Sequence, residues 1–311
     1  MSAPTASTRT LVVALLANLG IAVSKFVAAA ITGSSAMLTE GVHSVVDSTN
    51  QLLLMWGRRA AKKPPDKIHP FGYGRELYFW SFVVAVLVFS LGAGVSVYEG
   101  FIHIMHPEPA VSPLIAYAVL LIAFLLEGWS TIEAYRDFEQ SKGKIGWFEA
   151  IRRSKDPPAF IVLLENGAAM AGIIAAAIGL LLSQLTHDPF FDGAASIVIG
   201  IILGFTAALL AYESKGLLIG EAADPELVHG LRELACSKKG VVGVGHVLTI
   251  HSAPDIITAM INVDFENNIS AGEVEQIVCD VEHDAHQRWP QVRRLFIRPL
   301  HDAAAQLEER G

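Results

Sequence analysis

Residues 40–50 of this 311-residue chain read EGVHSVVDSTN, a polar run set inside a mainly apolar stretch that is long enough to cross a bilayer. Four of the polar residues share one face of the helix that this stretch predicts: Glu40, His43, Asp47 and Asn50. A helix turns about 100° per residue, so the four fall within an arc of roughly 80°. Ionisable side chains inside a membrane are costly and commonly mark ion pathways, so this face predicts half of a metal site. An interhelical hydrogen-bonding patch is the alternative interpretation.

Composition alone leaves two classes of protein open, because 52% hydrophobic and 17% charged residues suit a large soluble domain as well as a membrane bundle. Local patterning decides between them. Six apolar stretches of about 20 residues can each span a bilayer, and they lie at 11–31, 37–57, 79–103, 113–133, 159–185 and 193–213. The sequence therefore predicts an α-helical membrane protein with six transmembrane helices and with both termini on the same side.

Basic residues are distributed unequally between the loops that join these spans. The loops near 32–36, 104–112 and 186–192 contain no Lys or Arg, whereas the segments 58–67 and 136–155 are rich in both. The positive-inside rule then places both termini in the cytoplasm, or in the equivalent compartment of an organelle. We expect an integral protein of a bacterial inner (plasma) membrane.

The composition becomes mixed and polar near residue 222, which divides the chain into a transmembrane domain, 1–221, and a tail, 222–311. Periodicity in the tail predicts a helix, two strands, a helix and a strand, at 225–236, 241–250, 256–265, 271–288 and 292–298. Acidic residues outnumber basic ones in this αββαβ tail, which argues against nucleic acid as a partner. Its two thiols, Cys236 and Cys279, fall on different predicted helices, so we expect buried packing rather than a disulfide.

The second half of the metal site is expected in the fifth span, where Glu165 is the one acidic residue past the start of the helix. A lone buried carboxylate costs several kcal/mol unless a proton, a cation or a partner neutralises it. If this span packs beside the second, then His43, Asp47 and Glu165 supply one nitrogen and two carboxylates to a metal. Asn166, Glu40 or water would complete the shell. Imidazole favours zinc, iron, cobalt or nickel over magnesium and calcium.

Three features together resemble the cation diffusion facilitator family. They are the His43-x-x-x-Asp47 pair, the segment HPFGYGR at 69–75 that leads into the third span, and the αββαβ tail. The resemblance implies export of divalent transition metals in exchange for protons. It also implies a ferredoxin-like, metallochaperone-like tail that dimerises and regulates in the cytoplasm, and a homodimer embedded in membrane lipid. No permanent cofactor is implied, because the metal, most of all Zn²⁺, is the transported substrate.

The fifth span is most similar to the branch of that family that contains mitochondrial zinc-transporter-like proteins. Residues 163–169 read LLENGAA, where the branch has Leu-Leu-Glu-Asp-x-Ala-Ala. The acidic neighbour of Glu165 is therefore Asn166 in this chain. The usual second ligand pair is also missing, because Ile161 and Ala169 stand four residues from Glu165. The fourth metal ligand thus stays open.

Several other polar residues have more than one interpretation. Lys25, in the first span, is a partner for a buried acid or a side chain that reaches the membrane surface. Glu127, in the fourth span, is a structural hydrogen-bonding group or a proton relay, and Asp192 is a helix cap or part of an exit path. A metal site in the tail is a further candidate, with the ligands His246, His251, Asp255, His283, Asp284, His286, His301 and Asp302.

These observations predict a homodimeric six-helix antiporter that exports a divalent transition metal, most of all zinc, against protons. Manganese, iron and cobalt remain alternative cargoes. A second hypothesis is a membrane-embedded metal sensor that binds without transport, which the incomplete pair in the fifth span favours. A third, an intramembrane metalloenzyme, lacks a supporting His-Glu-x-x-His or Gly-x-Ser-x-Gly motif. We therefore expect a secondary transporter and not an enzyme.

Overall fold

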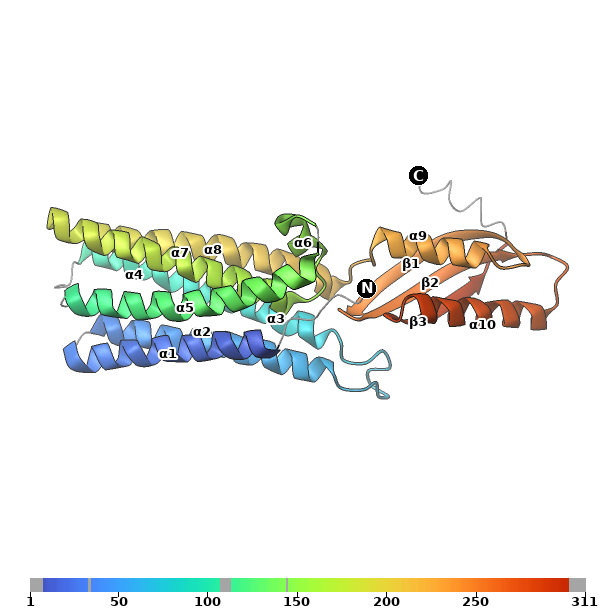
Figure 1. Ribbon diagram of the computed structural model, residues 1–311, viewed down its shortest axis with the longest axis horizontal. Helices are drawn as coiled ribbons and strands as arrows, with labels where there is room; N and C mark the ends of the chain where they lie inside the picture. The colour runs from blue at the N-terminus through green and yellow to red at the C-terminus, as the bar shows by residue number, and fades with distance from the viewer. Residues whose placement is uncertain (1–7, 33–34, 107–112, 144, 302–311) are drawn as a thin grey trace.

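The computed structural model describes residues 8–32, 35–106, 113–143 and 145–301, and it shows a helix bundle with the tail at one end (Figure 1). The bundle consists of α1 (Thr8–Thr32), α2 (Ser35–Ala61), α3 (Glu76–Leu87), α4 (Gly94–Met105), α5 (Pro113–Lys142), α7 (Pro157–Thr186) and α8 (Phe190–Ile219). A π-helical segment, η1 (Val88–Ala93), joins α3 to α4. A short helix, α6 (Trp147–Arg153), follows α5.

Five helical segments of the described chain are long and apolar enough to span a membrane: Thr8–Ile31, Glu76–Met105, Pro113–Gln140, Pro157–Thr186 and Phe190–Ile219. The helix α2 has a similar length of 27 residues, but it is less apolar because it carries the polar run at 40–50 and two arginines in its last turn. Polar residues within a membrane usually face the interior of a bundle, and α2 packs along both α1 and α3. The chain is thus an integral membrane protein, and α2 completes the predicted six spans.

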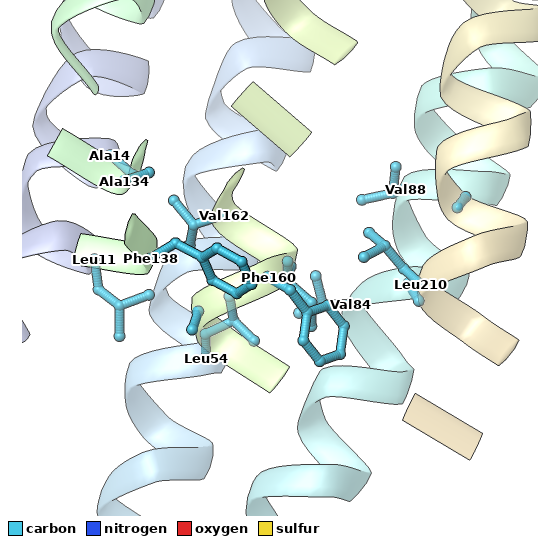
Figure 2. Close-up of a cluster of buried hydrophobic side chains, with 14 of the residues drawn as sticks. Leu11, Ala14, Leu54, Val84, Val88, Ala134, Phe138, Phe160, Val162 and Leu210 are labelled. Carbon is cyan, nitrogen blue, oxygen red and sulfur yellow. The ribbon is translucent and has the colours of Figure 1, made fainter. Parts of the chain in front are cut away.

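The order in which the helices pack determines which side chains can meet. The helix α1 contacts α2 and α5, α5 contacts α7, and α8 packs against α7, α3 and α4. Buried apolar side chains fill the end of the bundle that is nearest the tail (Figure 2). They include Leu11, Leu54, Phe138, Phe160 and Leu210, each 2% exposed or less. This core fixes the starts of α1 and α7 against the ends of α2, α5 and α8.

The tail has the predicted αββαβ order, with α9 (Pro225–Cys236), β1 (Val241–Ala253), β2 (Ile256–Phe265), α10 (Ala271–Arg288) and β3 (Val292–Pro299). The strands form one sheet in the order β1-β2-β3, in which β1 and β2 are antiparallel while β2 and β3 are parallel. The helix α10 begins with a capping box, in which Ser270 and Glu273 satisfy each other's backbone N–H groups. Apolar residues of α9, α10 and the sheet form a second core.

Three large apolar side chains lie in a row on the sheet, outside that core. Leu248 on β1 pairs with Met260 on β2, which pairs in turn with Phe296 on β3. They are 56%, 43% and 50% exposed, respectively. The sheet therefore has one face covered by helices and one face with an exposed apolar row.

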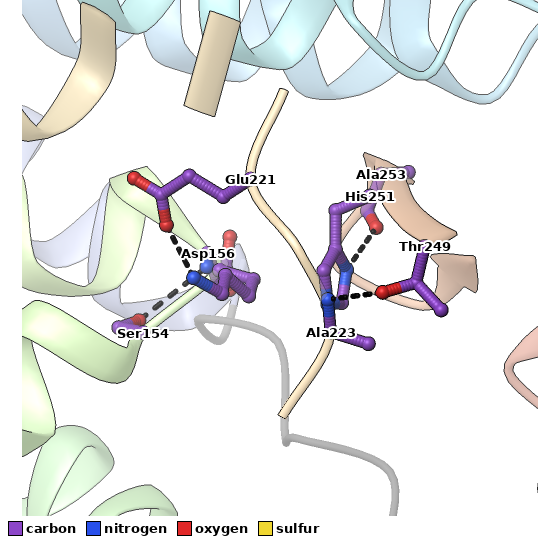
Figure 3. Close-up of polar contacts among 8 residues, drawn as sticks. Ser154, Asp156, Glu221, Ala223, Thr249, His251 and Ala253 are labelled. Carbon is purple, nitrogen blue, oxygen red and sulfur yellow. Dashed lines mark hydrogen bonds and ion pairs between the residues drawn. The ribbon is translucent and has the colours of Figure 1, made fainter. Parts of the chain in front are cut away.

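A short linker fastens the tail to the bundle (Figure 3). Lys155, just before α7, forms an ion pair with Glu221, just after α8. The backbone N–H of His251 on β1 donates to the carbonyl of Glu221 over 2.9 Å. Two residues further along, the N–H of Ala223 donates to Thr249 Oγ1 over 3.0 Å. The linker is thus bonded to the bundle on one side and to β1 on the other.

The loop between α2 and α3 makes a second connection to the tail. Arg294 on β3 donates from Nη2 to the carbonyl of Pro70 over 2.5 Å, and its guanidinium lies 4.5 Å from the centre of the Phe71 ring. In the same loop, a Cβ on Gly74 would lie 2.4 Å from the carbonyl oxygen of Ser252. Only a residue without a side chain fits there without displacing β1, so the loop and the tail are closely apposed.

One expectation about the tail is wrong. Cys236 and Cys279 are both free and exposed rather than buried. Each occupies the solvent side of its amphipathic helix, because the core positions of α9 and α10 are taken by Leu231, Ala235, Val281 and other apolar residues.

Candidate metal site

The carboxylate of Glu165 is the centre of the polar region inside the bundle. Glu165 lies on α7, and its two oxygens accept hydrogen bonds from Asn50 Nδ2 and Gln51 Nε2 on α2, each over 3.1 Å. Asn50 and Gln51 are 1% and 0% exposed. The structure therefore brings the acidic residue of the fifth span against the polar helix of the second.

The two amides also present oxygen atoms to this region. Among the described residues, none donates a hydrogen bond to Asn50 Oδ1 or Gln51 Oε1, although both atoms are buried. A buried oxygen without a donor is costly unless a proton, a water or a cation meets it. Amide oxygens are accepted ligands for divalent cations, so the surroundings of Glu165 suit a positive ion.

Asp47 lies one helical turn before these amides on α2 and is half-buried. It is close enough to Glu165 to interact with it electrostatically. Two carboxylates on different helices thus share one region inside the bundle, and such a pair attracts a cation or protons.

His43 and Glu40 belong to the helical part of α2, but their side chains lie outside the described residues. The backbone places His43 one further turn before Asp47, on the same face. The contribution of His43 to a metal site therefore stays a prediction from the sequence.

Asn166 points toward a different helix from Glu165. Its Nδ2 donates to Ser130 Oγ on α5 over 2.7 Å, and the side chain is 4% exposed. The structure thus links Asn166 to α5, while the adjacent Glu165 is linked to α2.

No group of three or more His, Cys, Asp or Glu side chains is close enough to hold a metal ion anywhere in the described part of the chain. This finding covers the tail candidates at 246, 251, 255, 283, 284, 286 and 301, whereas Asp302 lies outside it. His251, for instance, directs Nδ1 to the carbonyl of Ala253, 3.2 Å away (Figure 3).

Asp192 lies 3.8 Å from His103 Nε2, and Asp188 Oδ1 accepts the N–H of Phe190 at the start of α8.

Two residues of the site were not singled out from the sequence. Gln51 follows Asp47 by four positions, so the face containing Asp47 and Asn50 extends to it, and that spacing was the available signal. Ser130 gave no signal, because a lone serine in an apolar helix commonly bonds its own backbone.

A bundle of membrane-spanning helices with two half-buried carboxylates in its interior defines an integral membrane protein that can hold a cation or protons within the membrane. The chain belongs to the cation efflux family, since residues 11–219 match the cation efflux transmembrane domain.

Several characterised proteins are similar to this chain. The mitochondrial proton-coupled zinc antiporter SLC30A9 of Xenopus laevis is 33% identical over 247 residues, which cover 79% of this chain and 44% of the relative. The human SLC30A9 protein is 32% identical with the same coverage. Metal tolerance protein C4 of Arabidopsis thaliana is 34% identical over 222 residues, which cover 71% of this chain and 49% of the relative. The chain thus spans less than half the length of these relatives.

Proposed function

We propose that this protein exports divalent transition-metal ions, most of all Zn²⁺, across a membrane in exchange for protons. The observation that carries the proposal is the Glu165 carboxylate, which Asn50 and Gln51 hold against α2 beside Asp47. The names of the similar proteins support zinc as cargo and protons as the exchanged ion.

The exchange follows from the charge of the site. Asp47 and Glu165 in their ionised forms carry two negative charges, which either one divalent cation or two protons neutralise. Carboxylates and imidazole bind metal only when deprotonated, so protons and metal compete for the same atoms. A site that opens alternately to the two sides would therefore take up metal on one side and release it where protons replace it.

The choice of metal depends on His43. One imidazole with two carboxylates favours zinc, cobalt or iron over magnesium and calcium. Replacement of His43 with aspartate would leave oxygen ligands alone and would shift the preference toward harder ions such as manganese. Asn50, Asn166 and Glu40 remain candidates for the further ligand.

The assembly and the location are part of the same proposal. In the single chain, Leu248, Met260 and Phe296 are three large apolar side chains exposed on one face of the sheet. A homodimer held by the tails would bury this apolar row. The excess of basic residues in the loops on the tail side favours a cytoplasmic tail and an inner (plasma) membrane location.

Zinc flux into proteoliposomes that contain an internal pH dye tests the mechanism. We expect zinc movement to be matched by proton movement in the opposite direction, and Asp47→Asn or Glu165→Gln to abolish both. Glu133→Gln is the matched control, because Glu133 pairs with the exposed Arg9 over 2.8 Å on α5, a helix that carries none of the proposed ligands. Zinc movement that ignores imposed pH gradients would contradict antiport. Tight zinc binding without any flux would favour the metal-sensor hypothesis.

A further inference from the structure

Lys25 directs its charged group into the bundle rather than to the membrane surface. It lies on α1 and is half-buried, and its Nζ donates to Ser44 Oγ on α2 over 3.0 Å. The helices meet closely at this level, since a Cβ on Gly41 would lie 2.9 Å from the ring of Phe26. Ser44 stands one turn before Asp47, so the ammonium group lies beside the metal site described above.

Glu127 places a third carboxylate in the same region. It lies on α5, is 6% exposed, and has an oxygen, Oε2, that receives no hydrogen bond from the described residues. It interacts electrostatically with Asp47 and with Lys25. The helix α5 is close to α1 here, because a Cβ on Gly20 would lie 2.9 Å from Leu126, the residue before Glu127.

Polar contacts join these groups across four helices. Lys25 of α1 bonds Ser44 of α2, and α2 in turn bonds Glu165 of α7 through its two amides. The helix α7 returns to α5 through the bond from Asn166 to Ser130, which stands one turn after Glu127. The electrostatic interaction between Glu127 of α5 and Lys25 of α1 completes this series, and we call the arrangement of these groups on α1, α2, α7 and α5 the polar ring.

Among the side chains that the structure describes, the polar ring contains three carboxylates and one ammonium group. Three uncompensated negative charges in a membrane interior would be too many for one divalent ion to neutralise. A protonated lysine cannot bind a metal, but it can cancel one of these charges. With Lys25 offsetting one of the three, the four groups Asp47, Glu127, Glu165 and Lys25 carry a combined charge of −2.

We propose that Lys25, which α1 directs against Ser44 one turn before Asp47, is a built-in counter-charge for the carboxylates of the polar ring. It sets the net charge of the transport site to the value that one divalent cation neutralises. This inference rests on the proposed function and adds the origin of its charge selectivity. A monovalent ion would leave a negative charge in the membrane, and a trivalent ion would leave a positive one. Lys25 and Glu127 are therefore positioning and specificity residues, not ligands.

Equilibrium zinc binding by the purified full-length protein, together with zinc flux, tests the pair. Lys25→Gln makes the site more negative, so we expect the Kd for zinc to fall roughly tenfold or more and the maximal flux to fall with slower release. Glu127→Gln makes the site less negative, so the Kd should rise by a similar factor. The double variant Lys25→Gln/Glu127→Gln has the original net charge, and its Kd should return toward that of the unmodified protein.

The pair of Arg9 and Glu133 gives a matched control, because it also joins α1 to α5 but lies at the start of α1, with Arg9 74% and Glu133 15% exposed. Arg9→Gln and Glu133→Gln should leave the zinc Kd unchanged. A purely structural role for the inner pair would shift both single variants in the same direction and would make the double variant worse, which would overturn the inference. Unchanged Kd values in both single variants would overturn it as well. An unmodified protein that binds no zinc would instead defeat the proposed function, and this inference with it.

Discussion

Glu165 receives one N–H from each of two adjacent amides, and this arrangement defines the site at the scale of single residues. Each oxygen of the carboxylate is bonded separately, to Asn50 or to Gln51, so the side chain is fixed on α7 in one orientation. The bonds to a charged acceptor are stronger than those between neutral groups. The adjacent Asn166 contributes differently, because its hydrogen bond reaches Ser130 on another helix.

Replacement of Asn166 with aspartate would add a titratable group beside Glu165. Ser130 would then donate to the new carboxylate instead of accepting from the amide. We expect Asn166→Asp to make zinc flux fall more steeply as the pH falls, because one more carboxylate must lose its proton before metal binds. The preference for zinc over cobalt should change less. Initial flux rates over a series of pH values measure both effects.

Asn166→Ala is the control for that measurement, since it removes the bond to Ser130 without adding a charge. A pH profile for Asn166→Asp that superimposes on that of the unmodified protein would contradict the prediction.

At the scale of elements, the tail was predictable and part of the bundle was not. The periodicity of polar and apolar residues predicted α9, β2 and α10 at their observed bounds. Inside the membrane, apolar residues surround each helix, so no periodicity indicated the π-helical segment η1. Glu165 meets Gln51 because of the way in which α7 lies relative to α2. A single sequence does not indicate which helices contact each other.

Gly200 is one of the glycines at which α8 approaches the third span closely. A Cβ on Gly200 would lie 2.5 Å from Val97 Cγ2 and 3.1 Å from the carbonyl oxygen of Ala93, which ends η1. Gly200→Ala should therefore force the helices apart and destabilise the bundle by about 1–3 kcal/mol. Thermal unfolding of the detergent-purified protein measures this effect.

Gly204→Ala is the matched control, because it lies one turn further along the same helix. There a Cβ would be 3.6 Å from that of Ala93, which is an ordinary contact. Equal melting temperatures for the two variants would show that close approach at Gly200 is not required.

At the scale of the whole molecule, the tail is joined to the bundle where the transport helices begin and end. Glu221 follows α8 and pairs with Lys155 before α7, and its carbonyl accepts the N–H of His251. Arg294 makes the second connection, to the loop that follows α2. Movement of α2 relative to α7 and α8 would therefore be transmitted to the tail through two separate contacts.

The junction should weaken in acid because of His251. Burial lowers the pKa of His251, and the nearby Lys155 acts in the same direction, whereas the Ala253 carbonyl and Glu221 oppose it. In the unfolded chain His251 takes up a proton below a pH of about 6.5, whereas the folded structure disfavours this protonation. The free energy of unfolding is therefore retained above that pH and decreases below it. The loss should be at most about 1.4 kcal/mol per pH unit.

Thermal unfolding of the purified protein at a series of pH values measures this dependence. His251→Asn should remove part of it, whereas His229→Asn should not, because His229 has a 72% exposed side chain on α9. An unchanged dependence in His251→Asn would assign the effect to other groups.

The exposed thiols have a practical consequence. The chain has two cysteines, Cys236 on α9 and Cys279 on α10, and both lie on the outside of the tail. A thiol-reactive fluorophore or spin label would therefore attach to the tail and leave the membrane bundle unmodified. With Cys279→Ser, one reporter per chain would remain, and energy transfer between labelled copies in nanodiscs would test whether two tails associate as proposed and whether added zinc changes their separation.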